Sequence, residues 1–387
     1  MNPILKKLKV GGKIFMVSAE VTLEKKQKLK KARKLKQLME KKFLKKGISI
    51  GLFSGAAYGL YTALLTMGMT KGVWADWYGE NKAGLSTFVI VYLLAALGNA
   101  INDTCSAFWA LANAVYQGKF SDFLRCLKTK PGKTIVIAAF IGGPVAGTAY
   151  VVALQMAGAI IVPISALCPA IAAILGKIFY KQEISKRMAL GIVICVFASF
   201  LIGSTGFTGG VSMTVILGIL IAVLAAFGWG FEGCVAGYAS AMLDPQIGIC
   251  IRQLASGIAN LFIVLPILGL MAGGLDISVT LAVQAFTSAP AMFWFILSGL
   301  VTFLTFMTWY QGNSMCGAGL GTACNGTYSF FGPFFCYLLL GVIAKIDGWN
   351  LPMVAWIGAV IMMIGILVIA VNPLDFFTKK PVEEEDC

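Results

Sequence analysis

The 387-residue sequence contains no histidine. Without an imidazole the chain cannot form a Ser-His-Asp or Cys-His catalytic arrangement, a histidine-ligated metal site or a histidine proton relay. Any proton chemistry must therefore use carboxylates. The ten cysteines include no CxxC pair, and most lie in apolar stretches, so we interpret them as small apolar side chains. We expect no metal ion, no cofactor and no enzymatic activity.

Charged residues are also scarce, at 12% of the chain, whereas 58% of the residues are hydrophobic and the mean hydropathy is +0.84. Long uncharged stretches match the roughly 20 residues that a helix needs to cross a bilayer. Their apolar runs are continuous, whereas a transmembrane β-barrel would alternate apolar and polar residues. We predict an all-α integral membrane protein with ten transmembrane helices, at about 47–69, 84–117, 134–155, 158–179, 188–205, 211–239, 246–272, 290–311, 317–343 and 351–371.

The positive charges are distributed unevenly between the predicted loops. Residues 1–46 hold 16 of the 31 Lys and Arg, and the loops on the same predicted side raise that total to 27. The opposite side holds three, which are Lys71, Lys82 and Lys345. Because positive loops stay inside, we expect both termini in the cytoplasm and the protein in the cytoplasmic membrane as a multi-pass protein. Residues 373–387 would form a cytoplasmic tail.

Two segments depart from a simple helical span. The second predicted span, 84–117, is too long for one perpendicular helix, so we expect a tilt, a kink near Gly98 or an interfacial segment. The basic arm, 1–46, contains leucines at mostly three- or four-residue spacing between Leu23 and Lys46. This arm is either an amphipathic helix on anionic lipid headgroups or a solvated extension that fixes orientation. It lacks interleaved aromatic residues, so we expect no nucleic-acid partner.

The predicted spans also repeat weakly. Ala56–Tyr61 in the first span resembles Ala225–Gly230 in the sixth, and Cys168-Pro169 in the fourth resembles Gly332-Pro333 in the ninth. Five spans separate the copies, and an odd number places them in opposite orientations. An inverted repeat is typical of secondary transporters, whose substrate site lies between the two halves. We therefore predict two inverted five-helix repeats, 47–205 and 206–372.

The third-to-fifth-span segment contains a series of short motifs, which are Tyr150–Gln155, Gly158–Pro163, Pro169–Gly176, Glu183–Lys186 and Gly191. With these motifs it resembles the end of an EamA domain, which defines the drug/metabolite transporter superfamily. The resemblance covers about 47–371 and implies ten helices in a five-plus-five inverted repeat, with alternating access for a small organic molecule. The basic arm, the long second span and Gly348, near where a second copy would usually carry an acid, depart from the family pattern.

Ionisable residues inside the predicted membrane region are the first candidates for a site, because burying each in a bilayer costs about 2.5–3.5 kcal/mol. Glu232 lies in a glycine-rich helix three residues from Trp229, so the two share a face. An acid beside an aromatic wall suits a cationic ligand. The alternative is a structural acid paired with Arg252 on the next span. Asp103 lies four residues from Asn99 in a polar island, or else at a solvated helix end.

Further candidate substrate contacts are polar aromatic and amide residues within the spans. Tyrosines near helix ends are more often interface anchors, but these pairs lie three residues apart on one helix face. The candidate substrate-binding residues are Tyr58, Tyr61, Asp103, Tyr150, Trp229, Glu232, Asn325 and Tyr328, with Glu232 first and Asp103 second as proton-coupling residues and Arg252 as charge partner.

These features predict a secondary transporter for a small organic metabolite. One basic residue against two acids in the membrane argues against phosphorylated substrates, which call for several Lys or Arg. A cationic, quaternary-amine or zwitterionic compound such as choline fits better, and no GxxxxGK[ST] sequence supports ATP-driven transport. The alternatives are a proton-coupled exporter of amino acids or hydrophobic cations, and a non-transporting membrane scaffold or enzyme. The partners expected are the substrate and the lipid bilayer, with the chain a monomer or homodimer.

Overall fold

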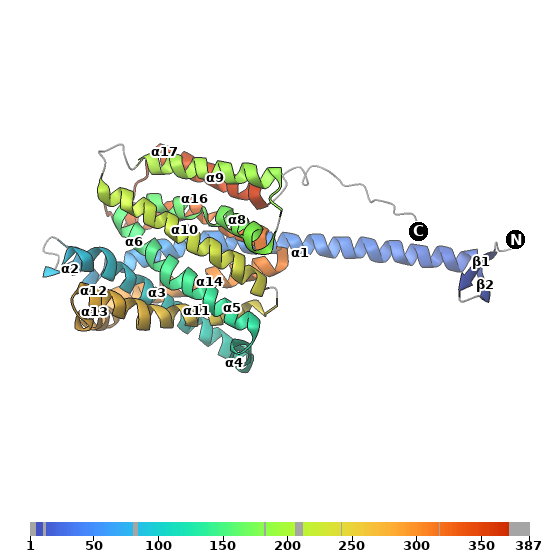
Figure 1. Ribbon diagram of the computed structural model, residues 1–387, viewed down its shortest axis with the longest axis horizontal. Coiled ribbons are helices and arrows are strands. Elements are labelled where there is room, and N and C mark those ends of the chain that lie inside the picture. Colours follow the sequence, from blue (N-terminus) through green and yellow to red (C-terminus); the bar gives the residue numbers. More distant parts are fainter. Residues whose placement is uncertain are drawn as a thin grey trace. The chain divides into compact units, whose positions relative to one another are not determined.

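A computed structural model describes residues 5–10, 13–79, 84–181, 183–205, 212–240, 242–316 and 318–370 (Figure 1). The contacts divide the chain into two compact units, Met1–Lys46 and Gly47–Cys387. The predicted repeats, 47–205 and 206–372, both lie within the second unit. The predicted tail at 373–387 lies outside the described residues.

The first unit contains two antiparallel strands, β1 (Leu5–Val10) and β2 (Lys13–Ser18), with Val10 opposite Lys13. The helix α1 (Ala19–Gly68) begins directly after β2. Apolar side chains of its basic part, such as Leu29 and Met39, are exposed. The structure contains no lipid, so binding of this arm to headgroups stays a prediction.

Gly47–Cys387 is helical throughout its described part. Two of its helix boundaries contain left-handed residues, Gly158 after α6 and Lys181 after α8. The elements that follow α1 in the first half are α2 (Val73–Tyr78), η2 (Val89–Leu93), α3 (Leu94–Tyr116), α4 (Phe120–Leu127), α5 (Lys130–Phe140), η3 (Ile141–Gly147), α6 (Thr148–Ala157), η4 (Gly158–Ile160), α7 (Ile161–Ser165), α8 (Cys168–Tyr180) and α9 (Lys186–Ser204).

The second half repeats this alternation of long helices and short π-helical turns. Its π-helical turns, η6 and η7, each continue a preceding helix, and Pro333 lies inside the helix before η7. Its elements are α10 (Met213–Ser240), α11 (Pro245–Ala259), η6 (Asn260–Val264), α12 (Leu265–Ala272), α13 (Leu275–Thr287), α14 (Ala289–Cys316), α15 (Ala318–Asn325), α16 (Tyr328–Cys336), η7 (Tyr337–Ile343) and α17 (Met353–Ala370).

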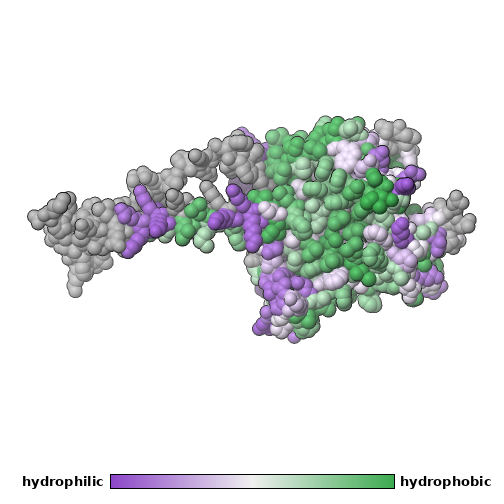
Figure 2. All heavy atoms as spheres, turned by 180° about the vertical axis from the view of Figure 1, so that it is seen from behind, coloured by the Kyte–Doolittle hydropathy of each residue, from purple (hydrophilic) through white to green (hydrophobic). Residues whose placement is uncertain are grey.

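In the described part of the chain, eight helices are long and apolar enough to cross a membrane. Shorter apolar helices cover Cys168–Phe179, Leu275–Thr287 and Met353–Ile369. Figure 2 shows a broad hydrophobic surface over the helical body, with hydrophilic residues gathered at its two ends. Large side chains such as Phe200, 74% exposed, contribute to it. A contiguous apolar surface of this extent is typical of contact with lipid, so the fold is that of a multi-pass membrane protein.

The second predicted span begins later than expected. Helix starts only after Ser86, a π-helical turn occupies Val89–Leu93, and the apolar helix runs from Val89 to Tyr116. Gly98 lies inside α3 against Met69, with no break in the helix there. Only residues 84–86 of the predicted span precede this helix, and the apolar helix of 28 residues is still longer than the roughly 20 that one perpendicular span needs.

Several helices begin where the sequence supplies a capping side chain. The hydroxyls of Thr129 and Ser185 accept hydrogen bonds from the backbone N–H of Gly132 and Met188, both at 3.2 Å. Asp244 caps α11 in the same way, through Gln246 N at 2.8 Å. Such caps satisfy amide groups that have no partner in the first helical turn.

Glycines allow α1 to approach the ninth predicted span closely. A Cβ at Gly55 would lie 2.7 Å from the carbonyl oxygen of Asn325, and a Cβ at Gly59 would lie 2.6 Å from the amide nitrogen of Gly332. Small residues at helix crossings are the usual way to bring backbones together in a membrane. This contact places Tyr58 of α1 against α16.

We expect Gly59→Ala to destabilise the protein by about 1–3 kcal/mol, because the added methyl group meets backbone atoms that cannot move independently. The control is Gly203→Ala in α9, where the nearest atom to an added Cβ is 3.9 Å away. Thermal unfolding of both variants in detergent measures the difference. Equal unfolding temperatures for the two variants would contradict the close α1–α16 contact.

Candidate functional site

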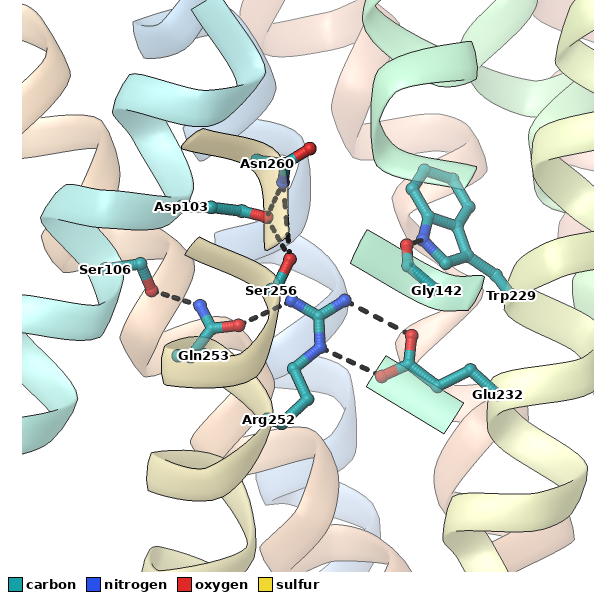
Figure 3. Close-up of polar contacts among 9 residues, drawn as sticks. All are labelled: Asp103, Ser106, Gly142, Trp229, Glu232, Arg252, Gln253, Ser256 and Asn260. Atoms are coloured by element: carbon teal, nitrogen blue, oxygen red, sulfur yellow. Dashed lines mark hydrogen bonds and ion pairs between the residues drawn. The ribbon is translucent and has the colours of Figure 1, made fainter. Parts of the chain in front are cut away.

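A buried ion pair joins α10 to α11. Arg252 Nε donates to Glu232 Oε1 at 2.9 Å and Arg252 Nη2 donates to Glu232 Oε2 at 3.2 Å, so the pair is bidentate (Figure 3). The Glu232 side chain is 0% exposed and that of Arg252 is 2% exposed. The bidentate geometry fixes both side chains as well as neutralising their charges.

Arg252 also connects this pair to two further elements. Its guanidinium carbon lies 3.8 Å from the centre of the Phe306 ring on α14, a cation–π contact. Arg252 Nη1 donates to Gln253 Oε1, and Gln253 Nε2 donates to Ser106 Oγ on α3 (Figure 3). The positive charge is thus enclosed by an acid, an aromatic face and an amide.

Asp103 lies in a separate polar cluster between α3 and α11. It is buried, so the structure excludes a solvated helix end for this residue. Ser256 Oγ donates to Asp103 Oδ2, and Asn260 Nδ2 donates to the same oxygen at 3.0 Å. Thr148 of α6 then donates to Asn260 Oδ1 at 3.4 Å, and Asn99 donates to Thr148 at 3.4 Å. The polar island around Asp103 therefore faces α11 and α6.

The glycine pair Gly142-Gly143 in η3 lies between the two clusters. A Cβ at Gly142 would overlap Glu232 Oε2, and a Cβ at Gly143 would overlap Ser256 Oγ. The carbonyl of Gly142 accepts a hydrogen bond from Trp229 Nε1 at 2.8 Å. One short backbone segment therefore contacts Trp229, the ion pair and the Asp103 cluster.

Aromatic side chains form a compact cluster beside these charges. Tyr58 lies at its centre and stacks on Tyr328 with ring centroids 4.0 Å apart. The rings of Tyr61, Trp229 and Tyr150 lie 4.7, 5.7 and 6.2 Å from that of Tyr58. The hydroxyl of Tyr150 shares a 2.9 Å hydrogen bond with Thr62. Five candidate residues from four helices thus contact one another.

A small cavity opens within this aromatic cluster. It encloses about 20 Å³, little more than the space that one water molecule needs. Sites for small organic ligands usually enclose about 300–1,000 Å³. The structure therefore represents a closed state, in which such a ligand would require the helices to move apart. The cavity is lined by Tyr58, Cys168, Trp229, Phe306, Trp309, Thr322, Asn325 and Tyr328.

Asn325 lies at the edge of this cavity and is tied to α1. Its Nδ2 donates to Ser54 Oγ at 2.7 Å, and Ser54 donates to the carbonyl of Thr305 at 2.7 Å. Trp309 Nε1 donates to Thr322 Oγ1 at 3.1 Å on the same side. These hydrogen bonds hold α1, α14 and α15 together around the cavity.

Two residues that the predicted repeat matches have different surroundings. Tyr58 is buried in the aromatic cluster, whereas Phe227, its match in the sixth predicted span, is 52% exposed and lies outside the cluster. Trp229, two residues after Phe227, contacts Tyr58. The short sequence motif does not distinguish Phe227 from Trp229 as the residue that enters the cluster.

The sequence identified Glu232, Arg252 and Asp103 as candidate site residues, but not the neutral side chains that form hydrogen bonds with them. Gln253, Ser256 and Asn260 follow Arg252 at helical spacing along one face of the α11–η6 segment. This polar face is a sequence signal that could have been paired with the polar island around Asp103. Phe306 and Gly142 carried no signal, because single aromatic and glycine residues are frequent in every span.

One further ion pair lies outside the apolar helices. Lys119 Nζ contacts Asp244 Oδ2 at 2.8 Å and donates to Gln246 Oε1 at 2.6 Å, which ties the end of α3 to the start of α11. Partial burial raises the pKa of Asp244, but hydrogen bonds from Lys119 and from Gln246 N outweigh it, so this pKa is lowered from its usual value.

Comparisons with known proteins define the fold and leave the family open. No protein-family model matches the chain, and no curated protein matches its sequence. One solved structure, described only as "Crystal structure of protein", aligns with a TM-score of 0.51 and 17% sequence identity over 87% of this chain and 99% of that chain. At this identity the likeness concerns the fold alone.

We expect Glu232→Gln to destabilise the protein by about 3–5 kcal/mol, because it leaves the buried Arg252 charge without its partner. The double substitution Glu232→Leu with Arg252→Met removes both charges and should recover most of that loss. Chemical unfolding in detergent measures the free energies, with Asp276→Asn on exposed α13 as the control. A single variant as stable as the control would contradict an energetically important pair.

The Lys119–Asp244 pair gives a pH-dependent prediction. Because the pKa of Asp244 is lowered in the folded state, the pair stabilises the fold above the ordinary carboxyl pKa of about 3.9 and loses that effect as pH falls through the lowered value. Asp244→Asn keeps a helix-capping side chain, so it isolates the ion pair.

At pH 7 we expect Asp244→Asn to cost about 0.2–1 kcal/mol, with the difference from wild type vanishing as the pH falls well below 4. Unfolding of Asp244→Asn, Lys119→Gln and the double variant forms a thermodynamic cycle. Strictly additive single losses would show that the two side chains do not interact.

Proposed function

We propose that this protein is a secondary transporter of the drug/metabolite transporter superfamily with EamA-like repeats. It moves a small cationic, quaternary-amine or zwitterionic metabolite, such as choline, across the cytoplasmic membrane by alternating access. The observation that carries the proposal is the closed aromatic cavity at the crossing of α1, α10, α14 and α16, directly beside a buried charge network. A substrate held there contacts side chains from both halves of the chain.

The packing pattern supports an inverted repeat. In the predicted repeat, each span of one half corresponds to the span five positions away in the other half. Under this correspondence the contact between α3 and α14 becomes the contact between α11 and α5, and the structure contains both. The same correspondence converts the contact of α10 with α8 into that of α1 with α16, and it leaves the pairs α3–α11 and α9–α17 unchanged. Two related halves that each contribute to a central site are the usual construction of a secondary transporter. The positive charge at 1–46 and in the loops of the same side supports cytoplasmic termini.

The chemistry of the cavity favours a cation with apolar substituents. The rings of Tyr58, Trp229 and Tyr328 present their faces and edges to one space, and a desolvated cation over such rings gains roughly 0.5–2 kcal/mol per ring. Glu232 is engaged by Arg252, so the ring faces rather than a free carboxylate provide the first attraction.

The Arg252–Glu232 pair also supports the zwitterionic part of the substrate class. The Arg252 guanidinium lies behind Phe306 and the Glu232 carboxylate behind Trp229, and both rings line the cavity. If these rings move, an ammonium group can replace Arg252 at Glu232 while a carboxylate replaces Glu232 at Arg252. An exporter of amino acids would use the same pair. A scaffold has no need of three charged side chains in its apolar core.

We expect purified protein in liposomes to take up labelled choline in preference to a neutral amino acid. Trp229→Ala should raise the apparent KM for choline about 2- to 30-fold, the equivalent of one lost cation–π contact. Trp229→Phe keeps a ring and should lie between wild type and Trp229→Ala. The matched control is Phe200→Ala, an aromatic truncation on the exposed face of α9.

Two results would contradict the proposal. The first is a wild-type protein that moves neither choline nor the amino acid faster than empty liposomes. The second is a Trp229→Ala variant with the same apparent KM as Phe200→Ala, which would place recognition outside the aromatic cavity.

A further inference from the structure

The buried charges in the apolar core do not balance. Among the described residues, Asp103, Glu232 and Arg252 are the fully buried charged side chains. Arg252 binds both oxygens of Glu232, and its remaining Nη1 donates to Gln253. One acid, Asp103, is therefore left without a cation in ion-pair contact in the described part of the chain. An isolated carboxylate in such surroundings is strongly disfavoured, and binding one proton removes its charge.

The groups that face Asp103 are mostly neutral donors. Ser256 and Asn260 of the α11–η6 segment both donate to Oδ2, which leaves Oδ1 for a proton. The titratable and charged groups nearby are Tyr61 of α1, Glu232 of α10, Arg252 of α11 and the adjacent Cys105 of α3. The polar groups that α6 and α14 contribute here are neutral hydroxyls. Thr148 of α6 contacts Asn260, and Ser298 and Thr302 of α14 both contact Asn102.

We propose that Asp103 is the proton-coupling residue of this transporter, and that it carries one proton per cycle at a position separate from the substrate cavity. The proposal rests on the transport function proposed above and names its coupling ion. The proton adds to the Asp103 carboxylate from one side of the membrane and leaves as a proton to the other, with no other bond made or broken. Glu232, the stronger candidate from sequence, instead contacts Arg252 through both of its oxygens.

The structure provides a direct connection between this proton and the substrate cavity. Trp229, which lines the cavity, donates to the carbonyl of Gly142. The next residue, Gly143, packs so closely on Ser256 that a Cβ would overlap its hydroxyl oxygen, and Ser256 donates to Asp103. A substrate that displaces Trp229 thus moves the backbone that holds Ser256 in place. Loss of the Ser256 hydrogen bond changes how strongly Asp103 holds its proton.

The direct test is pH-difference infrared spectroscopy of the purified protein, which requires no substrate. Wild type and Asp76→Asn, an exposed acid of α2, should show the carbonyl stretch of a protonated carboxyl group that disappears as the pH rises. Asp103→Asn should lack this band. Ser256→Ala should shift it in frequency and in midpoint pH, because one hydrogen bond to the carboxyl group is lost. If Asp103→Asn does not fold, the shift in Ser256→Ala remains decisive.

Three results would overturn the assignment: a band that persists in Asp103→Asn, no titrating band in wild type, or a band unchanged in Ser256→Ala. Glu232→Gln serves as the comparison at the other acid. A band that is lost in Glu232→Gln and kept in Asp103→Asn would assign the bound proton to Glu232 instead.

Transport measurements separate this proposal from the proposed function. With one proton per choline, a gradient of one pH unit should support about tenfold accumulation in wild-type liposomes. Asp103→Asn should lose this accumulation, giving a concentration ratio near one. Absence of all choline flux in wild type would contradict the proposed function, whereas the infrared band would still decide where the proton binds. Full accumulation by a folded Asp103→Asn would overturn the coupling role.

Discussion

The rest of the site depends on the ion pair between Arg252 and Glu232. Each of these ions costs several kcal/mol to remove from water, so the pair is tolerable only with good geometry and with its remaining donors satisfied. The bidentate contact, the face of Phe306 and the amide of Gln253 meet this requirement together. They fix the relative positions of α10, α11 and α14, and the aromatic cavity lies where these helices meet α1 and α16. The pair also leaves Asp103 as the one buried acid without a cation among the described residues.

The aromatic cavity in this structure is too small for an organic ligand. A space of about 20 Å³ lined by four tyrosine and tryptophan rings cannot hold an organic substrate, so the proposed transport requires the helices around it to separate. The structure contains places where such movement is inexpensive. A π-helical turn with three glycines and Pro144 lies beside the charges, and another π-helical turn follows Pro333. Helices commonly bend at such turns and at proline.

Much of the helical layout could be predicted because continuous apolar runs have few alternatives in a membrane. The three buried ionisable residues were also accessible from sequence, since their cost in lipid marks them as exceptions. Their partners were harder to find, because Ser256 and Asn260 show only a helical spacing and Ser106 becomes distinctive only when α3 and α11 lie side by side. The helix α13 was missed since its 13 residues are too few for a span and include Asp276 and Gln284. The contact of Trp229 with Tyr58 required the packing of four helices, which no local motif encodes.

The central claim is that the aromatic cavity beside the Arg252–Glu232 pair is where the substrate binds. The most direct measurement is an experimental structure of the protein in lipid nanodiscs, determined with and without saturating choline. The account predicts a quaternary ammonium group enclosed by Tyr58, Trp229 and Tyr328, in a cavity several times larger than the present one. Choline bound elsewhere, for example in the surface groove lined by Trp77 and Asp276, with the aromatic cluster unchanged, would contradict it.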